Sequence, residues 1–310
     1  MDIIGKRKIY YSISIVFIVL SVIFLILWGL KLGIDFKGGA ILEVSYADGK
    51  RPPVDSIYSS LKDLKLNDLR ISPVGDNGLT LRFRETDEQI HQKIIAYLNP
   101  PAEVKNGVAV ILKQVEEQRF SSIGPTIGAE LKKKALQAIT IVLLGISFYI
   151  AWAFRKVSKP ISSWRYGLVT LLALFHDLII PIGIFAYLGR FYGIEIGTNF
   201  IIALLVILGF SVHDTIVVFD RIRENLKRYE RLDFASIVNQ SVNETLVRSI
   251  NTSFTVLLTL FALYFFGGES LKYFILALLV GIFSGTYSSI FVASPLLVSW
   301  HDFLRNKRAL

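Results

Sequence analysis

The sequence predicts an α-helical membrane bundle of six transmembrane helices, with one α+β domain of the ferredoxin-like type between the first two helices. The first reason is composition: 53% of the 310 residues are hydrophobic and the mean hydropathy is +0.52, too apolar for one soluble domain. The second reason is pattern, because six apolar runs are each long enough to cross a bilayer as a helix. About 100 polar residues separate the first run from the second, enough for a small domain.

The six runs set the expected domain boundaries. They cover residues 9–30, 135–154, 166–188, 198–219, 249–266 and 271–299, and the fifth and shortest helix could extend toward Glu244. We expect the N-terminus and first helix at 1–32, an exported domain at 33–132, five further helices at 133–300 and a tail at 301–310. The first run is too long for a signal peptide and lacks a small-residue cleavage site, so it is expected to remain as an anchor.

The positive charges predict how the chain crosses the membrane. The formal net charge is +9, from 34 basic and 25 acidic residues, and most basic residues lie at the ends of apolar runs. This placement indicates membrane orientation rather than a nucleic-acid partner, and it puts both termini in the cytoplasm. Lys132, Lys133 and Lys134 lie on the opposite side, which is compatible because long exported domains cross largely regardless of charge. The chain has no cysteine, so disulfides and thiol chemistry are excluded.

The exported segment has an alternating pattern of strands and helices. Strands are expected at Ala40–Tyr46, Leu69–Ile71, Leu79–Phe83 and Val108–Val115, and helices at Val54–Leu66 and Asp87–Leu98. Asn77-Gly78 is a typical hairpin turn between the middle strands. The order β-α-β-β-α-β is the ferredoxin-like arrangement, with two helices on one face of one sheet. Its polar residues scatter as on a solvated surface, which indicates an interaction domain rather than a catalytic one.

Asp214 is the outstanding residue of the membrane part. It lies within the fourth apolar run, where a carboxylate costs about 2.5–3.5 kcal/mol unless it finds a partner or a proton. We interpret it as a proton-binding group, against the alternative of a structural carboxylate that never titrates. In the fifth run Arg248, Thr252, Thr255 and Thr259 follow i, i+4, i+7 and i+11 spacing and share one helical face. We expect that face to point into the bundle, although Arg248 could instead reach the lipid headgroups.

Other polar and small residues of the spans are weaker candidates. His176 and Asp177 could form a second polar station on a hydrated path or a packed structural pair, and His213 could tune the polarity around Asp214. No helix shows the i, i+4 ligand spacing of zinc proteases, so no metal is expected. Gly33–Gly39 lacks the end of a phosphate-binding loop and is expected to be a tight passage into the first strand. Gly281 and Gly285, with Ala277, Ser284 and Ser288, form a small-residue face that favours close helix packing.

Taken together, the motifs resemble the SecF family of membrane subunits. The matching segments are Gly33–Gly39, Ser122–Pro125, Gly128 to Leu131, His176-Asp177, His213–Asn225, and Asn243 to Ser253. The resemblance covers essentially the whole chain, and the order of the motifs on six spans is far more specific than any one motif. The family is similar in plan to half of a transporter of the resistance-nodulation-division (RND) type.

The resemblance carries functional expectations. It implies a subunit of the Sec protein-export machinery in the cytoplasmic membrane that acts with SecD and uses the proton motive force to promote late steps of translocation. Asp214 matches the proton-carrying aspartate of the family and Arg248 its functional arginine. The implied partners are a SecD-like subunit, the Sec translocon channel and the translocating polypeptide. We expect no cofactor and no enzymatic activity.

Three other classes of protein remain open at this point. An RND-type exporter of small molecules or lipids would need larger outer domains around a substrate cleft. An intramembrane enzyme would need a catalytic pair, for which Asp177 and Asp214 are candidates without a surrounding signature. A scaffold subunit of the translocase would keep its function when Asp214 is neutralised.

Overall fold

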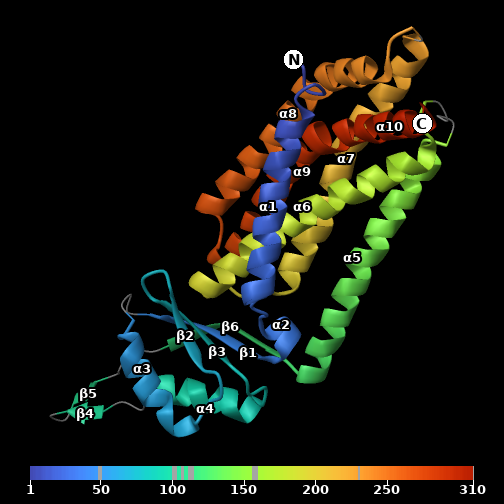
Figure 1. The fold of residues 1–310 in the computed structure, drawn as a ribbon. Coiled ribbons are helices and arrows are strands. Elements are labelled where there is room, and N and C mark those ends of the chain that lie inside the picture. The colour runs from blue at the N-terminus through green and yellow to red at the C-terminus, as the bar shows by residue number, and fades with distance from the viewer. Residues whose placement is uncertain are drawn as a thin grey trace. The chain divides into compact units, whose positions relative to one another are not determined.

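The computed structural model of the chain describes residues 1–47, 51–99, 103–105, 108–110, 115–155, 160–229 and 231–309. The chain divides into two compact units, which are described separately: Met1–Lys31 with Ala135–Leu310, and Leu32–Lys134. The first unit is helical, and the second contains the β-sheet (Figure 1). The loop residues Lys156 and Lys159 and part of the expected strand 108–115 lie outside the described residues.

Six segments of the described chain are long and apolar enough to cross a membrane, as the sequence predicts. They are α1 (Arg7–Trp28), α5 (Pro125–Ala153), α6 (Ser163–Phe191), α7 (Thr198–Arg228), α8 (Phe234–Phe266) and the continuous segment Lys272–Lys307. The last combines α9 (Lys272–Ser288), a π-helical turn (Ser289–Ala293) and α10 (Ser294–Ala309). Helix α8 begins well before the apolar run because the Asp233 side chain accepts a hydrogen bond from the Ser236 amide and caps it.

Helices α6 and α9 form the centre of the helical unit. The most apolar windows of α6 and of the segment Lys272–Lys307, which contains α9, are both 67% buried, compared with 11%, 6% and 17% for α1, α5 and α8. Glycines allow the close contacts: a Cβ atom on Gly183 of α6 would lie 2.2 Å from the Ser21 Cβ of α1. The outer helices therefore leave most of their surface for lipid or for another protein.

The second unit is a four-stranded antiparallel sheet with helices on one face (Figure 1). In chain order its elements are α2 (Ile34–Lys37), β1 (Gly39–Tyr46), α3 (Val54–Leu61) with a 3₁₀ turn (Lys62–Leu64), β2 (Arg70–Val74), β3 (Gly78–Phe83), α4 (Glu88–Leu98) and β6 (Val115–Ile123). The strand order is β2-β3-β1-β6, and every adjacent pair is antiparallel. Alternate residues of the strands and the inner faces of α3 and α4 share one apolar core.

The expectation for the closing strand of this unit was wrong, whereas the predicted hairpin is present with its turn slightly earlier than Asn77-Gly78. The strand that closes the sheet is Val115–Ile123 rather than Val108–Val115, and Val108–Val110 (β5) instead pairs with Glu103–Lys105 (β4). The closing strand lies at an edge of the sheet and exposes Glu116 to Arg119, so its sequence lacks the apolar alternation that marks a buried strand. The hairpin turn lies between β2 and β3 over residues 75–77, where Gly75 has φ 57°, and Gly78 already belongs to β3.

The glycine-rich passage contains one helical turn, α2, that the sequence did not predict. After it, Gly38 and Gly39 have φ of 79° and 132°, which L-residues rarely adopt. A Cβ atom on Gly38 would lie 2.8 Å from the Cα of Pro125, at the start of α5. The expected close approach of two backbone segments is therefore confirmed, and it occurs between the first strand and the second membrane helix.

Candidate functional site

Two aspartates are buried in the helical unit. Asp177 of α6 is 0% exposed and Asp214 of α7 is 2% exposed. Buried carboxylates in membrane helices are rare because the charged form is costly there, so each needs a specific structural explanation. Their surroundings differ sharply, and that difference suggests different roles.

Asp177 is surrounded by hydrogen-bond donors from three helices. The His176 ring nitrogen Nδ1 lies 2.9 Å from its carboxylate. The hydroxyls of Ser211 on α7 and Ser288 on α9 donate to it at 2.5 and 2.7 Å, and that of Ser284 at 3.4 Å. We call these five residues the Asp177 cluster. These hydrogen bonds satisfy the carboxyl oxygens, so the cluster joins α6, α7 and α9 around one buried side chain.

Small residues on α9 make the Asp177 cluster possible. A Cβ atom on Gly281 would lie 2.1 Å from the Ile207 Cδ1, and one on Gly285 would lie 2.9 Å from the Ser211 Cβ. Any larger side chain at these positions would push α9 away from α7 and carry Ser284 and Ser288 with it. The small-residue face predicted from the sequence is therefore confirmed, and it packs within this chain.

Asp214 has a much sparser environment. Among the described residues, its carboxyl group accepts a hydrogen bond from the hydroxyl of Ser253 on α8, at 3.3 Å. Ser253 in turn accepts a hydrogen bond from Thr286 of α9, at 2.6 Å. One long hydrogen bond offers little compensation for a buried charge. Asp214 therefore has far fewer hydrogen-bond partners than Asp177, although both side chains are buried.

The polar face of α8 that was predicted to point into the bundle is largely exposed. Arg248 and Thr255 are exposed, Thr252 is half-buried, and the described residues form no ion pair between Arg248 and Asp214. The face of α8 that is buried instead carries Ser241, Thr245, Ser249 and Ser253, which are 0%, 7%, 2% and 1% exposed. Adjacent residues of a helix point about 100° apart, so an offset of one residue moves a side chain off the buried face.

The remaining candidate residues, His213, His176 and Asp177, do not lie together at one site with Asp214. His213 is exposed on α7 although Asp214 beside it is buried. Asp177 is hydrogen-bonded to His176 and to the serines of the Asp177 cluster, whereas Asp214 is hydrogen-bonded to Ser253 of α8. The Nε2 atom of His176 is buried without a hydrogen-bond partner among the described residues. The structure thus contains two separate polar centres rather than one continuous path through His176 and Asp177.

A third polar group joins the ends of α7 and α8. Glu244 accepts hydrogen bonds from Arg221 Nε at 2.5 Å, Asn225 Nδ2 at 2.8 Å and Gln240 Nε2 at 2.9 Å. Asn225 is fully buried and also donates to Ser241 at 3.0 Å. Arg221, Asn225 and Glu244 belong to the family motifs, whereas Gln240 and Ser241 lie just before the second of these motifs, and only the structure brings the two motifs into contact.

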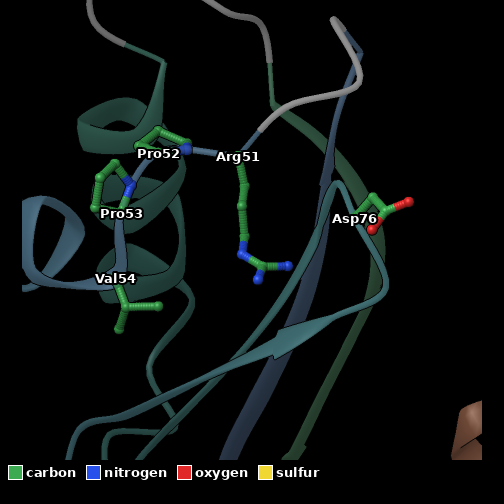
Figure 2. Close-up of a pocket in the computed structure, with 5 residues that line it drawn as sticks. All are labelled: Arg51, Pro52, Pro53, Val54 and Asp76. Atoms are coloured by element: carbon green, nitrogen blue, oxygen red, sulfur yellow. The ribbon is translucent and has the colours of Figure 1, made fainter.

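No group of three or more acidic, histidine or cysteine side chains in the described part of the chain could hold a metal ion. A hollow of about 390 Å³ is lined by Arg51, Pro52, Pro53, Val54 and Asp76 (Figure 2). The Arg51 guanidinium donates a hydrogen bond to the Gly75 carbonyl oxygen at 2.5 Å. This contact links the segment before α3 to the turn between β2 and β3.

Comparison with known proteins identifies the family. The family described as "Protein export membrane protein SecD/SecF, C-terminal" matches residues 103–302, and the "SecD/SecF GG Motif" matches residues 28–49. The chain is 45% identical to protein translocase subunit SecF of Thermobaculum terrenum, over 98% of this chain and 96% of that one. It is 40% identical to the SecF of Anaerolinea thermophila, over 97% and 94% of the two chains.

Solved structures agree with the sequence relatives. The crystal structure of SecDF from Thermus thermophilus, a translocon-associated membrane protein, matches with a TM-score of 0.79 at 31% identity. The match covers 97% of this chain and 39% of the SecDF chain, so this chain corresponds to part of that longer protein. The chain therefore belongs to the SecF family of protein translocase subunits.

Proposed function

We propose that this SecF-family subunit acts with a SecD-like partner and uses the proton motive force to promote late steps of polypeptide translocation across the cytoplasmic membrane. The observation that carries the proposal is Asp214, a carboxyl group 2% exposed in a membrane helix with one hydrogen bond of 3.3 Å. A group that is neutral when alone and ionised beside a cation is suited to bind and release a proton. No cofactor or enzymatic step is part of this function.

Arg248 is the proposed cation that biases Asp214 toward its ionised form. It lies five residues before Ser253 on α8, about 7.5 Å along the helix axis and about 140° around it. Since a guanidinium keeps its proton in practice, Arg248 acts through its electric field and does not carry the proton. Protonation of Asp214 then weakens this attraction and shifts the packing of α7 against α8.

The outward polar residues support a protein partner. Arg248, Thr255 and His213 are exposed on membrane helices, where contact with lipid is unfavourable for charged and polar groups. A SecD-like subunit that covers these parts of α7 and α8 would bury them among protein groups. His213 and Thr252 thus belong to the partner side of the Asp214 site, while His176 and Asp177 anchor the three helices behind it.

The exported domain is the proposed moving part. We infer a ferredoxin-like domain over residues 33–132, supported by the strand order β2-β3-β1-β6 with α3 and α4 on one face. The distribution of basic residues supports cytoplasmic termini and an external position for this domain. Movement of the domain beside the Sec translocon channel would draw the emerging polypeptide outward.

Secretion assays with Asp214→Asn test this function. The variant is co-expressed with its SecD-like partner, and late secretion is followed with and without a proton gradient. We expect the gradient-dependent part of secretion to disappear while the two subunits still purify together. Asp220→Asn is the matched control, because Asp220 lies on the same helix but is exposed and pairs with Arg223. If Asp214→Asn keeps its gradient dependence, the chain is a scaffold and the proton site lies elsewhere.

A further inference from the structure

The buried face of α8 carries a row of hydroxyl groups that leads away from Asp214. Ser241, Thr245, Ser249 and Ser253 follow strict i, i+4 spacing, and all are at most 7% exposed. We call them the hydroxyl stripe. At 1.5 Å per residue the stripe extends for about 18 Å along the helix axis.

Both ends of the hydroxyl stripe touch ionisable or amide groups of α7. At one end Ser253 donates to Asp214 at 3.3 Å. At the other end Ser241 accepts from Asn225 at 3.0 Å, and the same Asn225 amide donates to Glu244 at 2.8 Å. The side chain of Glu244 is 29% exposed, so this end opens to solvent. The stripe therefore joins the buried carboxyl group to a surface carboxylate along the α7–α8 contact.

Unsatisfied polar atoms lie along the same line. The Ser249 hydroxyl, in the middle of the stripe, is buried and has no hydrogen-bond partner among the described residues. The Oδ1 atom of Asn225, at the Glu244 end, is buried and unpartnered in the same sense. Buried polar atoms almost always have partners, and ordered water supplies them where protein groups do not. Two such atoms on one line indicate where water molecules bind.

The spacing of the hydroxyl stripe suits alternating hydroxyls and waters. Successive members are about 6 Å apart along the helix axis. Two O–H···O hydrogen bonds of about 2.8 Å each span nearly this distance, so one water fits between neighbouring hydroxyls. A hydroxyl both donates and accepts a hydrogen bond, and it can pass on one proton as it receives another.

We propose that the hydroxyl stripe, completed by bound water, is the route by which the proton of Asp214 leaves toward the cytoplasm. The protonated Asp214 gives its proton to the chain, each link passes one proton onward, and the last one leaves to bulk water at the solvent-exposed end beside Glu244. Asp214 becomes a carboxylate, and the hydroxyls and waters are unchanged in composition. This inference rests on the proposed proton-coupled function and adds the residues of the exit path.

Proton flux into liposomes tests the route directly. The complex of this chain with its SecD-like partner is reconstituted with a pH-sensitive dye inside, and an acid jump is applied on the side of the exported domain. We expect Thr245→Val and Ser249→Ala to slow acidification by about tenfold or more, the change expected when one buried hydrogen-bonding group is lost from the path. Ser249→Thr retains a hydroxyl and should keep most of the flux.

Thr170→Val is the matched control. Thr170 is fully buried on α6, and its hydroxyl donates to the Tyr166 carbonyl at 2.8 Å, as that of Thr245 donates to the Ser241 carbonyl at 3.0 Å. The two substitutions therefore remove the same interaction, and only one of them interrupts the stripe. Co-purification with the partner verifies the assembly of each variant.

The outcomes separate the path from the function on which it rests. Normal flux in Thr245→Val and Ser249→Ala, with flux lost in Asp214→Asn, overturns the hydroxyl stripe and leaves the proton site standing. An equal loss in Thr170→Val also overturns it, because the effect would then come from packing. Unchanged flux in Asp214→Asn refutes the proposed proton coupling itself, and the exit path with it.

Discussion

Replacing each buried aspartate by alanine should have opposite effects on stability and on function. Asp177→Ala leaves the donors of the Asp177 cluster, from His176, Ser211 and Ser288, buried without their acceptor. Each buried donor left without its acceptor costs about 1–3 kcal/mol. Asp214→Ala removes one hydrogen bond of 3.3 Å, worth about 1 kcal/mol, and also removes a carboxyl group that is costly to bury.

The loss in free energy of unfolding caused by each substitution can be measured on the purified chain in mixed micelles. Unfolding is followed by far-ultraviolet circular dichroism as the concentration of denaturing detergent increases. We expect Asp177→Ala to lower the free energy of unfolding by at least about 2 kcal/mol more than Asp214→Ala does. In secretion the order reverses, since Asp214→Ala abolishes gradient dependence in a chain that remains folded. Equal destabilisation by the two substitutions would refute the division into a structural and a titrating carboxyl group.

Two further predictions concern the sheet unit. Gly38→Ala should destabilise this unit by at least about 1–3 kcal/mol, because Gly38 has φ 79° and the new Cβ atom would lie 2.8 Å from the Pro125 backbone. Thermal unfolding measures this loss of stability. An unchanged melting temperature would contradict the prediction. Hydrogen bonds from Gln92 and His91 hold the pKa of Glu88 below its ordinary value of 4.5, so the stability they add is complete above that pH and is lost as the pH falls through the lowered pKa. The melting temperature of Glu88→Gln should therefore lie below that of the unmodified chain at neutral pH and converge with it in acid, and a constant difference would disprove the linkage.

Much of the architecture follows from local sequence patterns. Apolar length alone locates the six spans, because a helix in lipid must satisfy every backbone hydrogen bond internally. A lone carboxylate in an apolar run is expensive wherever it points, so Asp214 could be selected without knowledge of its neighbours. The family motifs, read in order, also suffice to predict the SecF family.

The orientation of helices about their axes could not be predicted in the same way. Helix α8 carries hydroxyl residues on two faces, one containing Arg248 and the other containing Ser249, and both have helical periodicity. We predicted that the face with the arginine points into the bundle, whereas the buried face is the one with Ser249, which is 2% exposed. The choice depends on how α8 packs against α7 and α9, and that packing combines contributions from residues far apart in the chain.

The role of Asp177 required the tertiary structure for the same reason. By itself the sequence determined that the chain has six segments long and apolar enough to cross a membrane, a polar segment of about 100 residues between the first two, and an aspartate within the fourth apolar run. Only the fold decided that Ser211 and Ser288, from two other helices, satisfy Asp177 and leave Asp214 nearly alone. Hydrophobic length is a property of each segment, whereas the hydrogen bonds that distinguish the surroundings of the two aspartates form between segments.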